Sequence, residues 1–542
     1  MPDTTSPPAL PQQRPASAGE WDGPDGGFVA SRYHTGGDGS GGRITGVALA
    51  AVVLLAAAIV IVPGTVGPGL GIAAVGVGTA LVLAGLNSPA VAIVLLVVTM
   101  FFRQGLKIEA LPAEPYLFAF AGVLGAGGVA LSRHRSRAPQ FGVVEGVMAM
   151  FLFWAIASAV FPHKYHAGDG NPVHYFILLS IVVPFVLYIV GRSVIDNERT
   201  IRVLVWAFIA IFAYSVWHSI LQFHAKSLAW PNTVADFSEG ASWANRALGV
   251  FGNPVENGFV LVVGFLLALY MAKERGARPL PKLVLYLLVI ASLYAIFLTR
   301  TRVVYAVFVV ALIIGVLAIP RIRAICGTLL GLGSLLVVAA YPILLSDDRN
   351  AGGLTSSYEI QDRLNMAATG WWALKQNPIV GWGIARFADV NTYHHKQWSQ
   401  DVPWFRGYGI KAHINELGIA VELGLIGLAL WVTILVLVGR KLKASIRALE
   451  NGTGGFAGRE LAVLFASIAA LWVVVGLTVD LRYLSVANAL TWLLAGVAVG
   501  MGERAAAGPT AGPAFAPPAA TTATPEHLDE DEELYLRWVA QR

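Results

Sequence analysis

The sequence predicts an all-α polytopic membrane protein with about 12–14 transmembrane helices and one large extracytoplasmic loop domain. Of its 542 residues, 56% are hydrophobic and only 13% are charged, whereas a soluble domain carries about 25% charged residues. The low content of charged residues reflects long apolar runs such as Ile44–Val62 and Ile414–Val438. About 18 apolar residues suffice to cross a bilayer, and a soluble core could bury one such helix but not many.

The apolar runs divide into about fourteen candidate spans, with boundaries good to a few residues. They are 44–62, 66–85, 89–102, 116–132, 141–161, 174–191, 203–222, 254–272, 283–299, 303–319, 324–345, 414–439, 461–479 and 483–501. The span at 89–102 is short and could instead be re-entrant.

Lysine and arginine in the short loops predict the orientation, because such loops favour the cytoplasmic side. With the N-terminus inside, every strongly basic short loop falls on that side: Arg133–Arg137, Arg192–Arg202, Lys273–Lys282, Arg321–Arg323 and Arg440–Lys443. We therefore predict a multi-pass protein of the cytoplasmic membrane with both termini in the cytoplasm.

This orientation predicts five regions along the chain. They are a disordered cytoplasmic tail at 1–43, the first eleven spans at 44–345, a large, partly helical extracytoplasmic loop at 346–413, the last three spans at 414–501, and a cytoplasmic Ala/Pro linker with an acidic tail at 502–542. Pro, Gly, Ser and Asp dominate residues 1–43, a composition typical of disorder. The first apolar run starts late for a signal peptide, so we expect a retained span.

The large loop holds five tryptophans: Trp371, Trp372, Trp382, Trp398 and Trp404. Residues Ser357–Gln376 predict a helix, which Asn377-Pro378 would end. Aromatic rings can dock sugars, but tryptophan is also enriched at membrane interfaces, and the sequence leaves both interpretations open.

Three arginines lie on the predicted outer side, close to the bilayer. Arg246 precedes the eighth span, and Arg300 and Arg302 occupy the almost loop-free junction of the ninth and tenth spans. They are either snorkelling residues at helix ends or a clamp for phosphate, whose oxygens match the paired donors of guanidinium.

His413, directly after the large loop, could accept a proton from a hydroxyl or be structural. Glu416 follows three residues later, so on a helix it would share a face with His413 and could orient the ring. Glu422 would lie on the opposite face near mid-bilayer, where an acid needs a partner or a proton. Asp480, in the short outer turn between the last two spans, belongs either to a solvated turn or to a site.

The sequence predicts no metal site and no cofactor. Cys326 is the only cysteine, and neither a His-Glu-x-x-His pattern nor a Gly-rich phosphate loop is present. The net charge of +5 comes from loop residues, and we do not expect nucleic-acid binding.

Three stretches together resemble the O-antigen ligase and polymerase family, the enzymes that use undecaprenyl-pyrophosphate-linked glycans. Arg246–Pro254 resembles the family's Arg…Gly-x-Phe…Asn-Pro, and Thr299–Arg302 resembles its Ser-Arg signature. The third stretch combines Asn-Pro-x-x-Gly-x-Gly at Asn377–Gly383, Ala412-His413, and Glu-x-Gly-x-x-Gly at Glu422–Gly427. One departure is Ile414 after the histidine, where the family commonly has asparagine; here Asn415 comes one place later.

The resemblance implies an inverting, metal-independent glycosyltransferase. By this analogy Arg246 and Arg302 would hold the donor pyrophosphate and stabilise its charge as it leaves, and His413 would deprotonate or orient the acceptor hydroxyl. Substrate-binding roles then fall to Arg300, Arg363, Glu416 and Asp480. The implied partners are an undecaprenyl-pyrophosphate-linked glycan donor, a glycan, lipid or protein acceptor, and membrane lipids.

The leading functional hypothesis is therefore a glycan ligase or polymerase at the outer face of the cytoplasmic membrane, and no motif separates these two activities. One alternative is a transporter or flippase for lipid-linked glycans. It would favour charges deep in many spans, but 303–319 and 461–479 contain none. The other is a non-catalytic envelope assembly factor that docks through 526–542.

Overall fold

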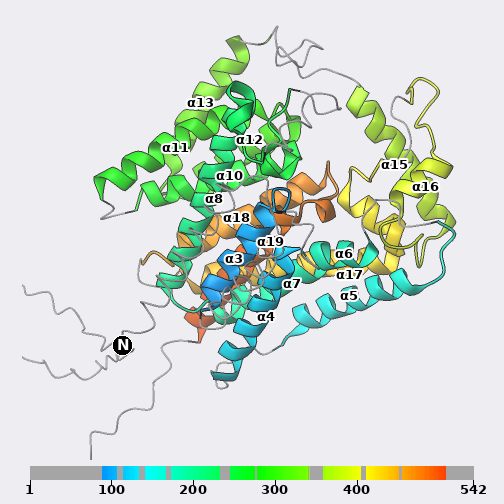
Figure 1. Cartoon of the computed structure of the whole chain (residues 1–542), viewed down its shortest axis with the longest axis horizontal. Helices are drawn as coiled ribbons and strands as arrows, with labels where there is room; N and C mark the ends of the chain where they lie inside the picture. Colours follow the sequence, from blue (N-terminus) through cyan, green and yellow to red (C-terminus); the bar gives the residue numbers. More distant parts are fainter. Residues whose placement is uncertain are drawn as a thin grey trace, which may run out of the picture.

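The computed structural model describes residues 88–106, 114–133, 141–165, 172–231, 245–274, 278–339, 341, 358–404, 410–450 and 455–507. The predicted N-terminal tail, the spans 44–62 and 66–85, and the C-terminal tail from residue 508 lie outside these ranges. Within them the chain forms helices joined by turns (Figure 1).

Every predicted span that falls within the described residues coincides with a helix. The membrane helices are α3 (Pro89–Phe101), α4 (Pro115–Arg133), α5 (Val143–Val160), α6 (Val173–Ile177) continuing through a π-helical turn (Leu178–Val182) into α7 (Val183–Val194), α8 (Glu198–His224), α10 (Pro254–Ala272), α11 (Pro279–Leu298), α12 (Arg302–Ala318), α13 (Arg323–Ala339), α17 (Asn415–Ala448), α18 (Arg459–Gly476) and α19 (Ser485–Ala506). Eight are long and apolar enough to cross a membrane, and four are shorter apolar helices. The chain is therefore an all-α multi-pass membrane protein.

The helices α10 and α19 form the centre of the bundle, because their apolar windows are 100% and 94% buried. The helix α19 packs against α7, α17 and α18, and the approach to α7 is close: a Cβ on Gly496 would lie 2.2 Å from the Tyr188 carbonyl oxygen. Small residues permit such contacts between membrane helices. By contrast, α5 and α11 leave most of their apolar side chains on the outside of the bundle.

Ion pairs gather where α7 ends and α8 begins, and where α12 leads into α13. Arg192 contacts Glu145 and, at 2.6 Å, Glu503; Arg321 lies 2.9 Å from Glu460. Arg202 packs 4.2 Å above the centre of the Phe456 ring and pairs with Glu198 at 2.8 Å and with Glu274. We call this the basic-loop end, because it holds the loops predicted to be cytoplasmic.

Where the structure describes the segment predicted as a large loop (358–404 and 410–413), it forms two helices beside α17: α15 (Tyr358–Gln376) and α16 (Phe387–His394) (Figure 1). The helix predicted at 357–376 is confirmed. Between α15 and α16, Trp372 and Trp382 pack with Tyr165 and His394, with ring centres 4.9 Å apart for Trp372 and His394. These two tryptophans therefore build the interior of the segment, whereas Trp371 and Trp398 are exposed.

Candidate active site

A cavity of about 520 Å³ opens at the end of the bundle opposite the basic-loop end, and it brings together distant parts of the sequence. Among the predicted site residues, only Glu416 does not line it. Six cationic and three acidic side chains belong to the lining: Arg103, Arg246, Arg300, Arg302, Arg363 and Lys411 against Glu256, Asp362 and Asp480. With His413 neutral, the wall has an excess of three positive charges. We call it the cationic cavity, and this end of the bundle the cavity end.

Three helices hold the segment that carries Arg246. The amide of Leu248 donates to Gln222 of α8 at 3.0 Å, Asn257 of α10 donates to the Ala247 carbonyl at 3.1 Å, and the Ala247 amide donates to the carbonyl of Leu298 at the end of α11. Asn257 is fully buried. Buried amide groups are retained when they are hydrogen-bonded, so this network positions the Arg246 backbone at the cavity wall.

The Gly-x-Phe-Gly-Asn-Pro segment after Arg246 turns the chain into α10. Gly249 has a φ of 60°, and a Cβ there would lie 2.3 Å from Asn257 Oδ1. Asn253 caps α10, because its side-chain oxygen accepts from the Val255 amide at 2.9 Å, and Pro254 begins the helix as proline commonly does. This motif is thus explained locally as the entry of α10.

In Thr299–Arg302 the two threonines bond the backbone, whereas the two arginines line the cavity. Both threonines are buried and bond the backbone: Thr299 donates to the Ile296 carbonyl and Thr301 to the Thr299 carbonyl, each at 2.7 Å. Arg300, in the left-handed region with φ 45°, packs over the Phe223 ring at 5.3 Å. Arg300 and Arg302 both line the cationic cavity.

His413 lies before α17 and not within it. The helix begins at Asn415, with Ile414 as its extended N-cap residue. The expectation that Glu416 shares a helical face with His413 is therefore wrong, because His413 does not belong to that helix; Glu416 Oε1 accepts from Asn415 Nδ2 at 3.2 Å. Asn415 Oδ1 accepts from the Leu481 amide at 3.2 Å, which joins the His413 segment to the turn that carries Asp480.

The structure adds cavity residues that the sequence reasoning did not select. Arg103, after α3, bonds Glu114 through Nε at 2.5 Å and Nη2 at 3.0 Å. Burial alone would lower the pKa of Arg103, but the hydrogen bonds and charge of Glu114 raise it above its usual value. Glu256 caps α19 by accepting from the Val486 amide at 2.7 Å. The sequence does contain a signal for Arg103, because this arginine directly follows the predicted span 89–102 on the same predicted outer side as Arg246.

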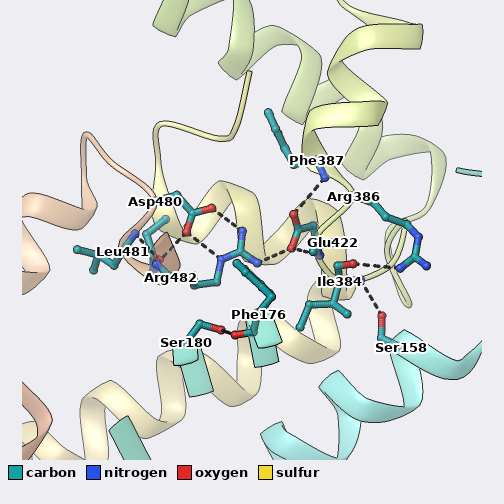
Figure 2. Close-up of polar contacts among 12 residues, drawn as sticks. Ser158, Phe176, Ser180, Ile384, Arg386, Phe387, Glu422, Asp480, Leu481 and Arg482 are labelled. Carbon is teal, nitrogen blue, oxygen red and sulfur yellow. Dashed lines mark hydrogen bonds and ion pairs between the residues drawn. The ribbon is translucent and has the colours of Figure 1, made fainter. Parts of the chain in front are cut away.

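A buried ionic triad underlies one wall of the cavity (Figure 2). Arg482 lies 2.5 Å from Glu422 and 2.6 Å from Asp480, and all three are at least nine-tenths buried. A solvated turn at Asp480 is therefore excluded. Burial alone would lower the pKa of Arg482, but Asp480 and Glu422 raise it well above its usual value.

Glu422 also connects the membrane bundle to the segment between α15 and α16. Its carboxylate accepts from the amides of Ala385 at 2.9 Å and Phe387 at 3.1 Å, as Figure 2 shows for Phe387. The neighbouring Ile384 amide donates to Ser158 of α5 at 3.1 Å. Charge-assisted hydrogen bonds of this kind are stronger than neutral ones, so Glu422 fixes residues 384–387 against α17.

The turn Asn377–Gly383 docks into a break in α17. Gly424 interrupts the helix with φ 67° and ψ −171°. The amides of Trp382 and Gly383 donate to the carbonyls of Val421 and Glu422, and the Leu425 amide donates to the Pro378 carbonyl, each at 2.8 Å. The turn is the close neighbour of Gly424, since a Cβ there would lie 2.0 Å from the Ile379 oxygen.

Residues 287–432 match the family model described as O-Antigen ligase. The matched stretch runs from α11 into α17, so it contains Arg300, Arg302, Arg363 and His413 but neither Arg246 nor Asp480. The match confirms the resemblance to the O-antigen ligase and polymerase family over this part of the chain. No curated protein matches the chain.

Proposed function

We propose that this protein transfers or polymerises undecaprenyl-pyrophosphate-linked oligosaccharide at the outer face of the cytoplasmic membrane, for surface polysaccharide or glycoconjugate biosynthesis. The observation that carries the proposal is the cationic cavity, whose lining contains six cationic side chains and His413. A pyrophosphate group supplies the negative charge that complements this excess, and guanidinium groups bind its oxygens in pairs.

In the proposed reaction, an acceptor hydroxyl oxygen attacks the anomeric carbon of the donor sugar. The bond from that carbon to the pyrophosphate oxygen breaks, and undecaprenyl pyrophosphate leaves with the electron pair. His413 takes the hydroxyl proton as general base. Arg246 and Arg302 stabilise the charge that develops on the pyrophosphate, while Arg300, Arg363 and Asp480 bind the substrates. A single displacement of this kind inverts the anomeric centre.

The proposed sidedness rests on the distribution of charge between the two ends. The basic-loop end contains the arginines and lysines that favour the cytoplasm, so the cavity end faces outward and both termini lie in the cytoplasm. The acceptor would be a glycan, a lipid or a protein presented on that outer side. Because arginine replaces a metal as the partner of pyrophosphate, we expect transfer to continue in EDTA.

The experiment is glycan transfer by the purified protein in liposomes that contain a lipid-linked oligosaccharide donor. We expect His413→Ala and Arg302→Ala each to lower the rate by about 100-fold or more, the range seen when a transition-state stabiliser or a general base is removed. Matched controls are His395→Ala and Arg199→Ala, since both side chains are exposed and neither lines the cavity.

The controls should retain the rate of the unsubstituted protein. Full activity in both cavity variants would overturn the proposed mechanism. Movement of the lipid-linked donor across the bilayer without bond formation would instead favour a flippase.

A further inference from the structure

The turn Asn377–Gly383 belongs to the segment that the sequence assigns to the extracytoplasmic side, but its backbone bonds the interior of the span α17. Its partner in α17, Gly424, is nine residues after Asn415, the first residue of the helix. At the helical rise this distance is about 13 Å along the axis. A hydrocarbon core is about 30 Å thick, so the contact lies well inside the length of the span.

The helix α5 gives the same depth independently. Trp154 Nε1 donates to the Leu423 carbonyl at 2.9 Å, next to the break in α17. Trp154 lies six residues before Val160, where α5 ends, which is about 9 Å along the axis. Two helices from distant parts of the chain therefore place the turn below the cavity-end boundary of the spans.

We propose that the turn Asn377–Gly383 is inserted in the membrane and that Ile379 and Val380 contact the acyl chains of the leaflet at the cavity end. Ile379 is 62% exposed and Val380 52%, and the adjacent residue Leu425 of α17 is 49% exposed. Large apolar side chains thus continue from the outer surface of a membrane span onto the turn. Acyl chains, which cover that span, are the occupant that this continuity favours.

Several backbone groups of the turn meet a condition that the membrane imposes. Non-helical backbone is tolerated at membrane depth only where its polar groups are bonded within the protein. The break in α17 and the turn exchange backbone hydrogen bonds. Trp382 and Gly383 donate to carbonyls of α17, and Leu425 of α17 donates to the Pro378 carbonyl. Within the turn, Gly381 donates to the Asn377 carbonyl. Pro378 has no amide hydrogen to satisfy. The two glycine-containing motifs therefore form one hydrogen-bonded unit.

The insertion would also hold α15 in place relative to the cationic cavity. This helix carries Arg363, which lines the cavity, and it ends at Gln376, next to the turn. Near that end Trp371 is 58% exposed, and Lys375 Nζ lies 5.3 Å from its ring centre. Exposed tryptophan and lysine are typical of the membrane interface, which fits a helix that ends where the turn enters the bilayer.

Spin labels on single cysteines test the depth, because Cys326 is the only cysteine and Cys326→Ala leaves a background without thiols. We would label Val380→Cys in the full chain, in liposomes of phosphatidylethanolamine and phosphatidylglycerol. Phe153→Cys, on the outer face of α5, is the lipid-exposed control, and Ser399→Cys is the water-exposed control. Collision rates with oxygen and with a water-soluble nickel chelate report the depth.

We expect the label at Val380 to show the same collision pattern as the label at Phe153, with a higher collision rate for oxygen than for the nickel chelate. A Val380 label that follows Ser399 would overturn the proposal, and protection from both reagents would also overturn it, since a second protein copy would then cover the turn. A second measurement needs no substitution: a phospholipid with a diazirine on its acyl chain should label peptides that contain 379–380. Labelling of α5 without the turn would count against insertion.

Discussion

The balance of charge around arginine differs between the two ends of the helix bundle. At the basic-loop end, Arg192, Arg202 and Arg321 each contact a glutamate from another helix or loop. At the cavity end, the lining contains six cationic and three acidic side chains. Charges matched within the protein join helices to one another, whereas a wall with excess positive charge suits an anion from outside. At the cavity end arginine serves both purposes, since Arg482 and Arg103 pair with carboxylates of the protein, while the lining as a whole keeps an excess of positive charge.

Ion pairs of the bundle also differ in burial, and one cluster at the cavity end and one pair at the basic-loop end show the contrast. Arg482, Glu422 and Asp480 are almost fully buried at the cavity end, whereas the side chains of Arg321 and Glu460 are 22% and 29% exposed. Breaking a buried pair leaves an uncompensated charge, whereas water can solvate the partner of an exposed one. Paired substitutions at the two ends therefore test the effect of burial and the proposed catalytic role separately.

The largest expected effect is on stability, from Glu422→Gln. The change leaves Arg482 buried with Asp480 as its one carboxylate partner among the described residues and weakens the bonds to residues 384–387, so we expect a loss of about 3–5 kcal/mol in the free energy of unfolding. Glu460→Gln at the basic-loop end should cost at most about 1 kcal/mol. Denaturant unfolding in detergent measures both, and equal losses would contradict the distinction between buried and exposed pairs.

The second effect is on activity, from Arg246→Ala. We expect the transfer rate to fall by about 100-fold, because a charge that stabilises the leaving pyrophosphate is lost, with little change in unfolding. Arg202→Ala should do the reverse, with a normal rate and a stability loss of at most about 1 kcal/mol. Consumption of the donor measures the transfer rate, and thermal unfolding of the same preparations measures the stability. A similar rate loss in both variants would remove the functional contrast between the ends.

A third and smaller contrast lies within one helix, α17. Gly424→Ala puts a Cβ 2.0 Å from the Ile379 oxygen at a φ of 67°, so we expect a loss of about 2 kcal/mol or more in stability. Gly439→Ala, nearer the basic-loop end, meets nothing within 4 Å, and its stability should stay within about 1 kcal/mol of the unsubstituted protein. Thermal unfolding compares the two, and a neutral Gly424→Ala would argue against the docked turn.

Several features of the site could be predicted because their cause is local. The arginine pair in Thr299–Arg302 stands where two apolar runs almost meet, and Asn377-Pro378 ends a helix by the chemistry of its own residues. The position of Arg246 and His413 next to predicted spans, together with the family resemblance, points to both residues. By contrast, helical periodicity predicts the wrong neighbour for Glu416, because α17 starts at Asn415, after His413.

The sequence by itself determined the class of the protein and the position of its helices, because a bilayer requires long apolar runs and those runs are visible without any knowledge of packing. Only the tertiary structure decided that Glu422 pairs with Arg482, that Arg103 and Glu256 join the cavity, and that the turn Asn377–Gly383 fills the break at Gly424. These contacts join distant segments, and helices that are apolar on nearly every face carry little information about which neighbour each face meets.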